Sequence, residues 1–177
     1  TRRIHEDGLA ILREACEVAI GPAERDLPRD ELPAALKDCE GLLVSTHTKV
    51  DASLLDAAPR LRVVANFGVG LDHVDVEACS RRGLWVTNTA GSLTETTAEL
   101  GWALILATTR RIAEGDRQIR AGRWEGVGPL VFLGTELTGK SLGVVGAGRI
   151  GQAVARRAPA FGMRVLYTSR TPKPELA

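Results

Sequence analysis

The stretch Ser141-Leu-Gly-Val-Val-Gly146-Ala-Gly148-Arg-Ile-Gly151-Gln-Ala-Val-Ala places three glycines in the spacing G-x-G-x-x-G, between an apolar run and a helical pattern. In such a motif the first glycine permits a tight turn and the second lets the backbone approach a pyrophosphate. The third lets the helix pack closely on the strand. A helix that opens near Arg149 directs free N–H groups at the phosphates. The stretch predicts a dinucleotide site formed by Gly146, Gly148, Arg149, Ile150 and Gly151.

The residues around the motif decide whether it indicates a dinucleotide site, because glycine is common and the three glycines alone are weak evidence. Residues 142–145 have the pattern of a buried strand, residues 150–160 that of a helix, and residues 164–167 that of a second strand. A dinucleotide unit requires this order of strand, turn, helix and strand. The alternative, a glycine-rich turn that binds no ligand, does not account for the order. Pro159 should end or kink the helix early.

The loop after the second strand indicates which dinucleotide is bound. In NAD sites an acidic residue about 20 positions after the glycines holds the ribose 2′-hydroxyl. The matching position is Ser169, and no Asp or Glu lies between Gly151 and Lys173. A guanidinium offers a fixed charge and a planar donor fork, which suit a 2′-phosphate. We therefore predict NADP(H) in preference to NAD(H), bound by Ser169, Arg170 and Thr171. The alternative is that Arg170 is a solvated loop charge.

A second phosphate-binding pattern overlaps the first. Residues 134–141 match G-x-x-x-x-G-K-[ST], a loop for nucleoside triphosphates, which needs a helix directly after its Lys-Ser pair. A strand follows here instead. We interpret residues 138–140 as the turn that leads into the dinucleotide strand.

Composition excludes several classes of protein. The chain has 177 residues, of which 44% are hydrophobic and 25% charged, as is ordinary for a globular protein, and its net charge is +1. Its arginines occur in scattered pairs, so we expect no nucleic-acid partner. Three cysteines without C-x-x-C spacing and three distant histidines predict a reducing compartment and no metal site. The most apolar run, 100–107, is too short to cross a bilayer, so we expect a cytoplasmic protein.

The pattern before residue 88 alternates strands with helices, which predicts a parallel α/β sheet covered on both faces. Asp51 and Asp75 are expected to cap helices. We expect strands at 17–20, 41–44, 61–65 and 84–87, and helices at 5–16, within 28–37, at 52–58 and at 75–82.

The pattern changes after a boundary at 88–91. Ser92-Leu-Thr-Glu95 has the form of a capping box, from which one long helix is expected to run toward Arg120. Its first half is apolar on nearly every side, so it should be buried all round, with a partner subunit as one source of cover. Trp124 and Phe132 are possible anchors of the glycine-rich loop 122–134.

Both ends of the sequence predict a fragment. Thr1 is not a methionine, and Arg2-Arg3-Ile4 has the pattern of a strand that began earlier. The other end comes just after the second strand of the nucleotide unit, and a single such unit leaves a parallel sheet uncovered.

Four motifs in order resemble the D-isomer-specific 2-hydroxyacid dehydrogenases. They are Asn66-Phe-Gly-Val-Gly70-Leu-Asp-His-Val-Asp75, Gly83-Leu-Trp-Val-Thr-Asn88-Thr, Leu93-Thr-Glu-Thr-Thr97-Ala-Glu99 and the glycine motif. Phe132-Leu-Gly134 and Leu166-Tyr-Thr-Ser-Arg170 are similar to the glyoxylate/hydroxypyruvate reductase branch. The resemblance implies a flavodoxin-like substrate domain at 1–90, incomplete here. The first part of a Rossmann dinucleotide-binding domain would follow at 91–177, with homodimerisation through 92–120.

The resemblance also implies hydride transfer between a nicotinamide and carbon 2 of a small 2-keto acid. Val69 and Gly70 match the loop whose backbone N–H groups bind the substrate carboxylate, and glycines at 68 and 70 suit such an anion site. The alternative is a plain turn between strand and helix. Thr97, and less closely Leu93, match positions that line the nicotinamide, with first-turn helix packing as the alternative.

The family's Arg, Glu and His, which hold and protonate the keto acid, lie beyond residue 177. His47 and His73 fall outside the matched catalytic positions, so we expect no catalytic residue in this chain and no activity from it alone. The leading hypothesis is the N-terminal part of an NADPH-dependent glyoxylate/hydroxypyruvate reductase. The alternatives are a non-catalytic NADP(H)-binding or dimerisation module, as in corepressors of this fold, and another dehydrogenase of the family, for example one acting on formate, phosphite or phosphoglycerate.

Overall fold

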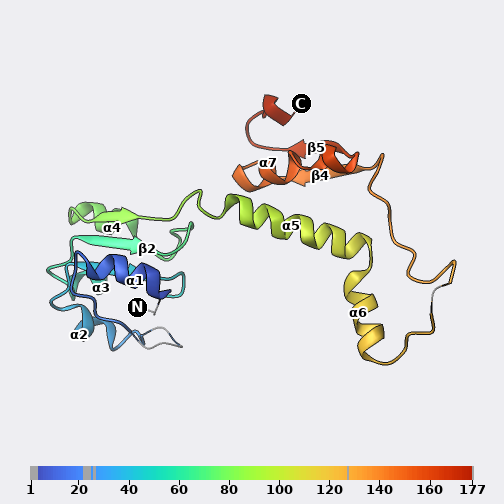
Figure 1. Ribbon diagram of the computed structural model, residues 1–177. Helices are drawn as coiled ribbons and strands as arrows, with labels where there is room; N and C mark the ends of the chain where they lie inside the picture. Colours follow the sequence, from blue (N-terminus) through green and yellow to red (C-terminus); the bar gives the residue numbers. More distant parts are fainter. Residues whose placement is uncertain (1–3, 22–24, 26, 127, 177) are drawn as a thin grey trace. The chain divides into compact units, whose positions relative to one another are not determined.

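The computed structural model describes residues 4–21, 25, 27–126 and 128–176. Their backbone contacts divide the chain into two compact units, Thr1–Ala90 and Gly91–Ala177. Both units are α/β, as predicted, and Figure 1 shows their helices and strands. The predicted strand at Arg2-Arg3-Ile4 lies mostly outside the described residues.

The first unit is built on a three-stranded parallel sheet. Its strands are β1 (Gly41–Val44), β2 (Val63–Asn66) and β3 (Trp85–Thr87), in the order β1-β2-β3. Leu42 of β1 pairs with Val64 of β2, which pairs with Val86 of β3. The parallel arrangement confirms the alternation of strands and helices seen in the sequence, because each parallel pair needs a crossover connection.

Four helices accompany this sheet: α1 (Glu6–Arg13), α2 (Leu32–Leu36), α3 (Ala52–Asp56) and α4 (Val76–Arg81). Both predicted caps are confirmed. The Asp51 carboxylate accepts a hydrogen bond from the Leu54 N–H at 3.1 Å, and that of Asp75 accepts one from the Ala78 N–H at 2.8 Å. These bonds satisfy amide groups at the helix starts that have no partner within the helix.

The core of the first unit joins side chains of the sheet to those of α2, α3 and α4. Its members are the buried residues Leu32, Leu36, Leu42, Val44, Val50, Leu54, Leu55, Ala58, Leu61, Val64, Val74, Ala78 and Cys79. Because this cluster is contiguous, it fixes the carboxyl ends of β1 and β2, from which the candidate substrate loop leaves.

The second unit pairs β4 (Ser141–Val145) with β5 (Arg164–Thr168) in parallel. Helix α7 (Arg149–Ala155) connects them and packs on α5 (Thr94–Thr109), as Figure 1 shows. The indole Nε1 of Trp102 on α5 donates to the Val154 carbonyl at 3.0 Å, and its ring stacks on Phe161 at 4.3 Å. The unit also contains α6 (Ile112–Arg120) and two short 3-10 helices, η1 (Ala158–Phe161) and η2 (Pro174–Leu176).

Pro159 acts as the sequence predicts. Helix α7 ends at Ala155, and Pro159 lies in η1, where its fixed φ and missing N–H are tolerated. The interpretation of residues 138–140 is also confirmed. Gly139, with φ of 76°, donates its N–H to the Gly162 carbonyl, and Ser141 begins a strand. The helix that a triphosphate loop needs is therefore not present at this position.

The single long helix predicted from residue 92 toward Arg120 is wrong. Helix α5 ends at Thr109, and α6 begins at Ile112 after Arg111 adopts a left-handed φ of 56°. The Arg111 guanidinium binds Glu114 and lies over the Phe132 ring, 5.4 Å from its centroid. Phe132 in turn stacks on Trp124. A tertiary contact with the loop 122–134 thus accompanies the break between α5 and α6. Local helix propensity does not reveal such a contact.

Two further local predictions are wrong. The N-cap residue of α5 is Leu93, which makes no side-chain cap, and the Glu95 carboxylate binds Arg157 at 2.7 Å instead of closing a capping box. Residues 17–20 form no strand. A strand needs a pairing partner, and the described part of the chain provides none for this segment.

The second unit leaves apolar surface uncovered among the described residues, as expected for a single strand–helix–strand unit and for a helix whose apolar sides need further cover. Leu100 and Leu104 of α5 are 60% and 59% exposed. Val145 of β4 is 92% exposed, and Leu166 of β5 is also exposed. The described residues cover these side chains incompletely, since the chain contributes two strands to this sheet.

Asp51 gives the first unit a pH-dependent contribution to stability. The hydrogen bond from Arg29 lowers the pKa of its carboxyl group to about 2. Since this is below the value of about 3.8 in the unfolded chain, the carboxylate stabilises the fold above pH 4 and loses that effect as the pH falls toward 2. Asp51→Asn should lower the free energy of unfolding by about 1 kcal/mol at pH 7, after allowance for solvent screening.

Urea unfolding of both proteins at pH 7 and near pH 2.5 measures this difference, which should shrink at the lower pH. A difference of equal size at both pH values would contradict the assignment to the charged carboxylate.

Candidate functional site

The glycine turn of the second unit joins β4 to α7 with the geometry that a dinucleotide motif needs. Gly146 has φ of 95°, which favours glycine, and its N–H donates to the Thr168 carbonyl at 2.9 Å. Gly148 is the N-cap residue of α7, and a Cβ at Gly148 would meet no atom within 4 Å. The backbone at Gly148 is therefore open to a bound group.

Gly151 performs the packing role of the third glycine. A Cβ at this position would lie 2.2 Å from the Gly146 carbonyl oxygen and 3.2 Å from Val144 Cγ1. Because the nearest atom belongs to the backbone, no side-chain movement relieves this clash. Any larger residue would separate α7 from the turn that it follows.

The start of α7 presents free donors. The N–H groups of Arg149, Ile150 and Gly151 donate to no acceptor among the residues that the structure describes. The Gln152 side chain donates to the Ala147 carbonyl at 3.1 Å, and this bond holds the turn to α7. This combination of open backbone and unpaired N–H groups fits a phosphate.

The loop after β5 carries the residues predicted to choose the cofactor. Ser169 is half-buried, while Arg170 and Thr171 are exposed. The Tyr167 hydroxyl accepts from the Lys173 N–H at 2.9 Å and donates to the Lys173 carbonyl at 3.1 Å, which closes the loop. Arg170 forms no ion pair with any described residue, so its charge is available to a ligand.

In the first unit, side-chain hydrogen bonds hold three successive carbonyl groups of the loop after β2. The Asn66 amide donates to the carbonyls of Gly68 and Gly70, and the Asn88 amide donates to that of Val69. The N–H groups of Val69 and Gly70 donate to no described residue. Two free amides on a held loop can bind a carboxylate.

A hollow of about 360 Å³ opens at the start of this loop. Phe67 lines it together with His5 and residues 43–47, which comprise the end of β1 and the segment after it. The hollow lies within the first unit and provides space for a small organic group beside the loop.

Thr97 and Leu93 lie at the start of α5 in the second unit. The Thr97 N–H donates to the Leu93 carbonyl at 3.0 Å, and both side chains are exposed. Glu95 of the same turn binds Arg157 and Arg156 at the end of α7, and these bonds lower the pKa of its carboxyl group. The ion pairs tie the first turn of α5 to the helix of the glycine motif.

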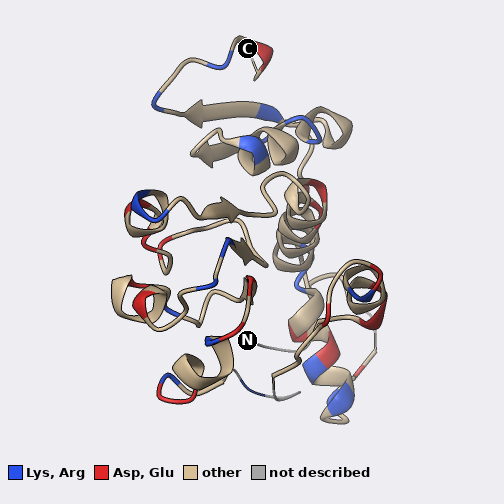
Figure 2. Cartoon of the chain, turned by 90° about the vertical axis from the view of Figure 1, so that its left-hand side faces the viewer, with Lys and Arg blue, Asp and Glu red and all other residues tan. Residues whose placement is uncertain are grey.

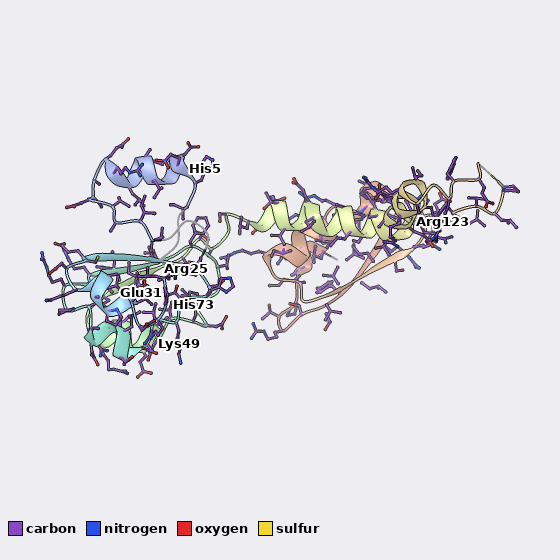
Figure 3. All side chains as sticks on the ribbon, turned by 90° about the horizontal axis from the view of Figure 1, so that it is seen from below. His5, Arg25, Glu31, Lys49, His73 and Arg123 are labelled. Carbon is purple, nitrogen blue, oxygen red and sulfur yellow. The ribbon has the colours of Figure 1, made fainter. Side chains whose placement is uncertain are left out.

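The histidines are dispersed. His5 at the start of α1 accepts a hydrogen bond from the Asp7 N–H, His47 is exposed, and His73 contacts Asn66; Figure 3 shows His5 and His73 well apart. Neither His47 nor His73 pairs with a carboxylate among the described residues. Neither therefore has the carboxylate partner that orients a catalytic imidazole.

Charges of both signs are interspersed along the chain, as Figure 2 shows, with no continuous basic stripe over the described residues. Within the same residues, no helix combines the length and apolar character that a membrane span requires.

A parallel α/β chain with a glycine turn between β4 and α7 has the arrangement of a dinucleotide-binding protein. A family model, described as D-isomer specific 2-hydroxyacid dehydrogenase, catalytic domain, matches residues 1–171. The chain belongs to the D-isomer specific 2-hydroxyacid dehydrogenase family.

Relatives agree with this assignment. The chain is 51% identical over 179 residues to a glyoxylate reductase of Thermococcus gammatolerans, covering 99% of this chain and 54% of the relative. It is 48% identical to a glyoxylate reductase of Pyrococcus furiosus, covering 98% and 53% respectively. The chain thus spans about half the length of the curated relatives that it matches.

Solved structures show the same fold. The TT0316 protein of Thermus thermophilus matches with a TM-score of 0.94 and 47% identity, over 98% of this chain and 56% of that one. The D-lactate dehydrogenase of Aquifex aeolicus, solved with NAD and lactic acid, matches with a TM-score of 0.80 and 28% identity, over 99% and 52%.

The sequence reasoning missed the side chains that support the two sites. Asn66 and Asn88 lie within the matched motifs without a predicted role, and no pattern identifies Tyr167 as the residue that closes the loop after β5. A buried asparagine directly before a glycine-rich loop is a signal for such a role, because a buried amide must find partners.

Gly151→Ala should weaken cofactor binding and destabilise the second unit by about 1–3 kcal/mol, because the added Cβ would displace α7 from the turn. Fluorescence titration with NADPH and thermal unfolding measure the two effects. Gly143→Ala is the matched control, since a Cβ at Gly143 meets no atom within 4 Å. Equal behaviour of the two variants would contradict the packing role of Gly151.

Proposed function

We propose that this chain is part of an NADPH-dependent reductase that converts a small 2-keto acid, glyoxylate or hydroxypyruvate, into the 2-hydroxy acid. The observation that carries the proposal is the 51% identity to a glyoxylate reductase over 99% of the chain. The open glycine turn and the free amides of the loop after β2 support it. The proposed cellular location is the cytoplasm.

Each unit would hold one reactant. The turn at Gly146, Gly148 and Gly151, with the amides of Arg149 and Ile150, would bind the pyrophosphate of the cofactor. The nicotinamide, when bound, supplies the hydride for carbon 2 of the keto acid. Thr97 would lie along the nicotinamide, and the N–H groups of Val69 and Gly70 would hold the substrate carboxylate, which fixes the keto carbon for reaction.

The residues after β5 support NADP(H) over NAD(H). An acidic side chain in this loop would bind the 2′-hydroxyl and repel a 2′-phosphate, and the loop contains none. Arg170, which has no ion-pair partner among the described residues, would bind the 2′-phosphate together with Ser169 and Thr171.

The proton that reaches the keto oxygen needs a donor outside this chain. His47 and His73 have no carboxylate partner among the described residues, and the motifs matched to the family here contain none of its Arg, Glu and His residues. We therefore propose that those residues come from another part of the protein and that the 177-residue chain alone is inactive.

The exposed apolar face of the second unit supports a homodimer through the 92–120 region. Leu100 and Leu104 on α5, and Ile112 and Ile119 on α6, are all more than half exposed. A second copy would remove these side chains from water, which is favourable for apolar surface.

The combination of cofactor and carboxylate sites without a proton donor also fits a second function. The chain would then be a non-catalytic NADP(H)-binding or dimerisation module. The similarity to a D-lactate dehydrogenase structure keeps another dehydrogenase of the family as a third candidate.

Two assays separate these functions. The complete native protein should oxidise NADPH when glyoxylate or hydroxypyruvate is added, whereas the isolated 177-residue chain should bind NADPH without turnover. Absorbance at 340 nm and fluorescence titration measure the two properties. NADPH binding by the complete protein without turnover of any 2-keto acid would instead favour the second function, a non-catalytic NADP(H)-binding or dimerisation module.

The double variant Ser169→Asp, Arg170→Ala should reverse the cofactor preference. It adds a carboxylate that accepts the ribose hydroxyl and removes the cation, so the ratio of NADPH to NADH dissociation constants should rise about tenfold or more. Arg164→Ala, which removes an exposed charge at the other end of β5, is the control. An unchanged ratio in the double variant would refute the NADP(H) assignment.

A further inference from the structure

Asn66, the last residue of β2, is the most buried polar side chain beside the candidate substrate loop. It is 2% exposed. Its Nδ2 donates to the carbonyl of Gly68 at 3.0 Å and to that of Gly70 at 2.7 Å. One amide group thus holds both glycines of the loop, and burial strengthens these bonds because water does not compete for them.

These two bonds set the direction of the neighbouring amides. In a trans peptide the carbonyl of one residue and the N–H of the next point to opposite sides of the same plane. Holding the Gly68 carbonyl therefore turns the Val69 N–H away from Asn66. The N–H of Val69 is one of the two donors assigned to the substrate carboxylate.

The second donor is fixed in the same way from another element. The Asn88 side chain, directly after β3, donates to the Val69 carbonyl at 2.8 Å, which turns the Gly70 N–H away from Asn88. The Thr89 N–H adds a bond to the Gly68 carbonyl at 3.0 Å. The loop is thus held from two neighbouring strands.

His73 fixes the orientation of the Asn66 amide. Since Nδ2 faces two carbonyl oxygens, Oδ1 must be the atom that faces His73, and the His73 Nε2 lies 3.1 Å from it. An oxygen there needs a donor, so Nε2 carries the hydrogen. His73 is half-buried and contacts no carboxylate among the described residues, which fits a supporting role better than acid–base chemistry.

We propose that Asn66 is a positioning residue for the substrate carboxylate, and that His73 holds its amide in the orientation that aims the Val69 N–H at the anion. The Asn66 bond to the Gly70 carbonyl steadies the residue whose N–H is aimed by the Asn88 bond. This inference rests on the proposed function, because the anion is taken to be the carboxylate of the 2-keto acid. Neither side chain touches the reacting atoms. Their effect is on binding and alignment.

Steady-state kinetics of the complete native protein tests the proposal. Asn66→Ala should raise KM for glyoxylate about ten- to a hundredfold, because the bond that aligns the Val69 N–H and the bond that holds Gly70 in the loop are both lost. The turnover number should change less, and the NADPH dissociation constant should not change. Asn66→Asp keeps the shape but sets a carboxylate against two carbonyl oxygens, so its KM should rise at least as far.

The His73 variants separate support from catalysis. His73→Leu should raise KM in the same direction as Asn66→Ala, while His73→Gln, whose amide keeps a donor, should restore most of the binding. A large fall in kcat for both His73 variants would overturn the positioning role. Leu55→Ala removes buried volume from α3 in the same unit and is the control for a general loss of stability.

Hydrogen exchange of the Thr89 N–H, which donates to the Gly68 carbonyl, is a readout that does not depend on activity. It should accelerate in Asn66→Ala and not in Leu55→Ala. If wild type turns over glyoxylate, an unchanged KM in Asn66→Ala, or an equal rise in Leu55→Ala, would overturn this inference alone. Absence of turnover in wild type would overturn the proposed function, while unchanged exchange in Asn66→Ala would overturn the positioning role itself.

Discussion

The close approach of α7 to the glycine turn is the contact on which the second unit depends. At Gly151 there is no room for a Cβ beside the Gly146 carbonyl oxygen, which would lie 2.2 Å away. This contact places the start of α7 directly over the turn after β4, and α7 in turn packs on α5 through Trp102. The amide donors that would hold a pyrophosphate are therefore positioned by packing, and no charged side chain is needed for the turn itself.

The first unit reaches a similar result by a different route. Its candidate carboxylate site also consists of backbone N–H groups, and those groups are oriented by hydrogen bonds to the carbonyls on the opposite side of each peptide. Asn66 and Asn88 supply these bonds from the ends of β2 and β3. In both units a parallel sheet fixes the start of a loop whose main chain carries the candidate binding groups.

The errors of the sequence analysis share a cause. The break at Arg111 accompanies contacts with Glu114 and Phe132, the second of which is 21 positions away. Glu95, which the local pattern assigns to a capping box, is bound by Arg157, 62 positions away. Residues 17–20 have strand composition, but none of the strands that the structure describes pairs with them. At Arg111 and Glu95 the observed contacts include partners distant in sequence, and for residues 17–20 no pairing strand is described. Local patterns do not contain that information.

The sequence by itself determined the parallel α/β class, the strand–turn–helix–strand order around the glycine motif, the caps at Asp51 and Asp75, and the early end of α7 near Pro159. These features depend on periodicity, φ preference and side-chain bonds between near neighbours, all of which act over a few residues. Only the tertiary structure decided that Asn66, Asn88 and His73 act together on one loop, and that Tyr167 closes another. The Asn88 bond to Val69 spans 19 positions, so it exists only once β2 and β3 are paired. The bonds of Asn66, His73 and Tyr167 span seven positions or fewer, but they depend on how each loop folds back on the strand before it, which periodicity does not specify.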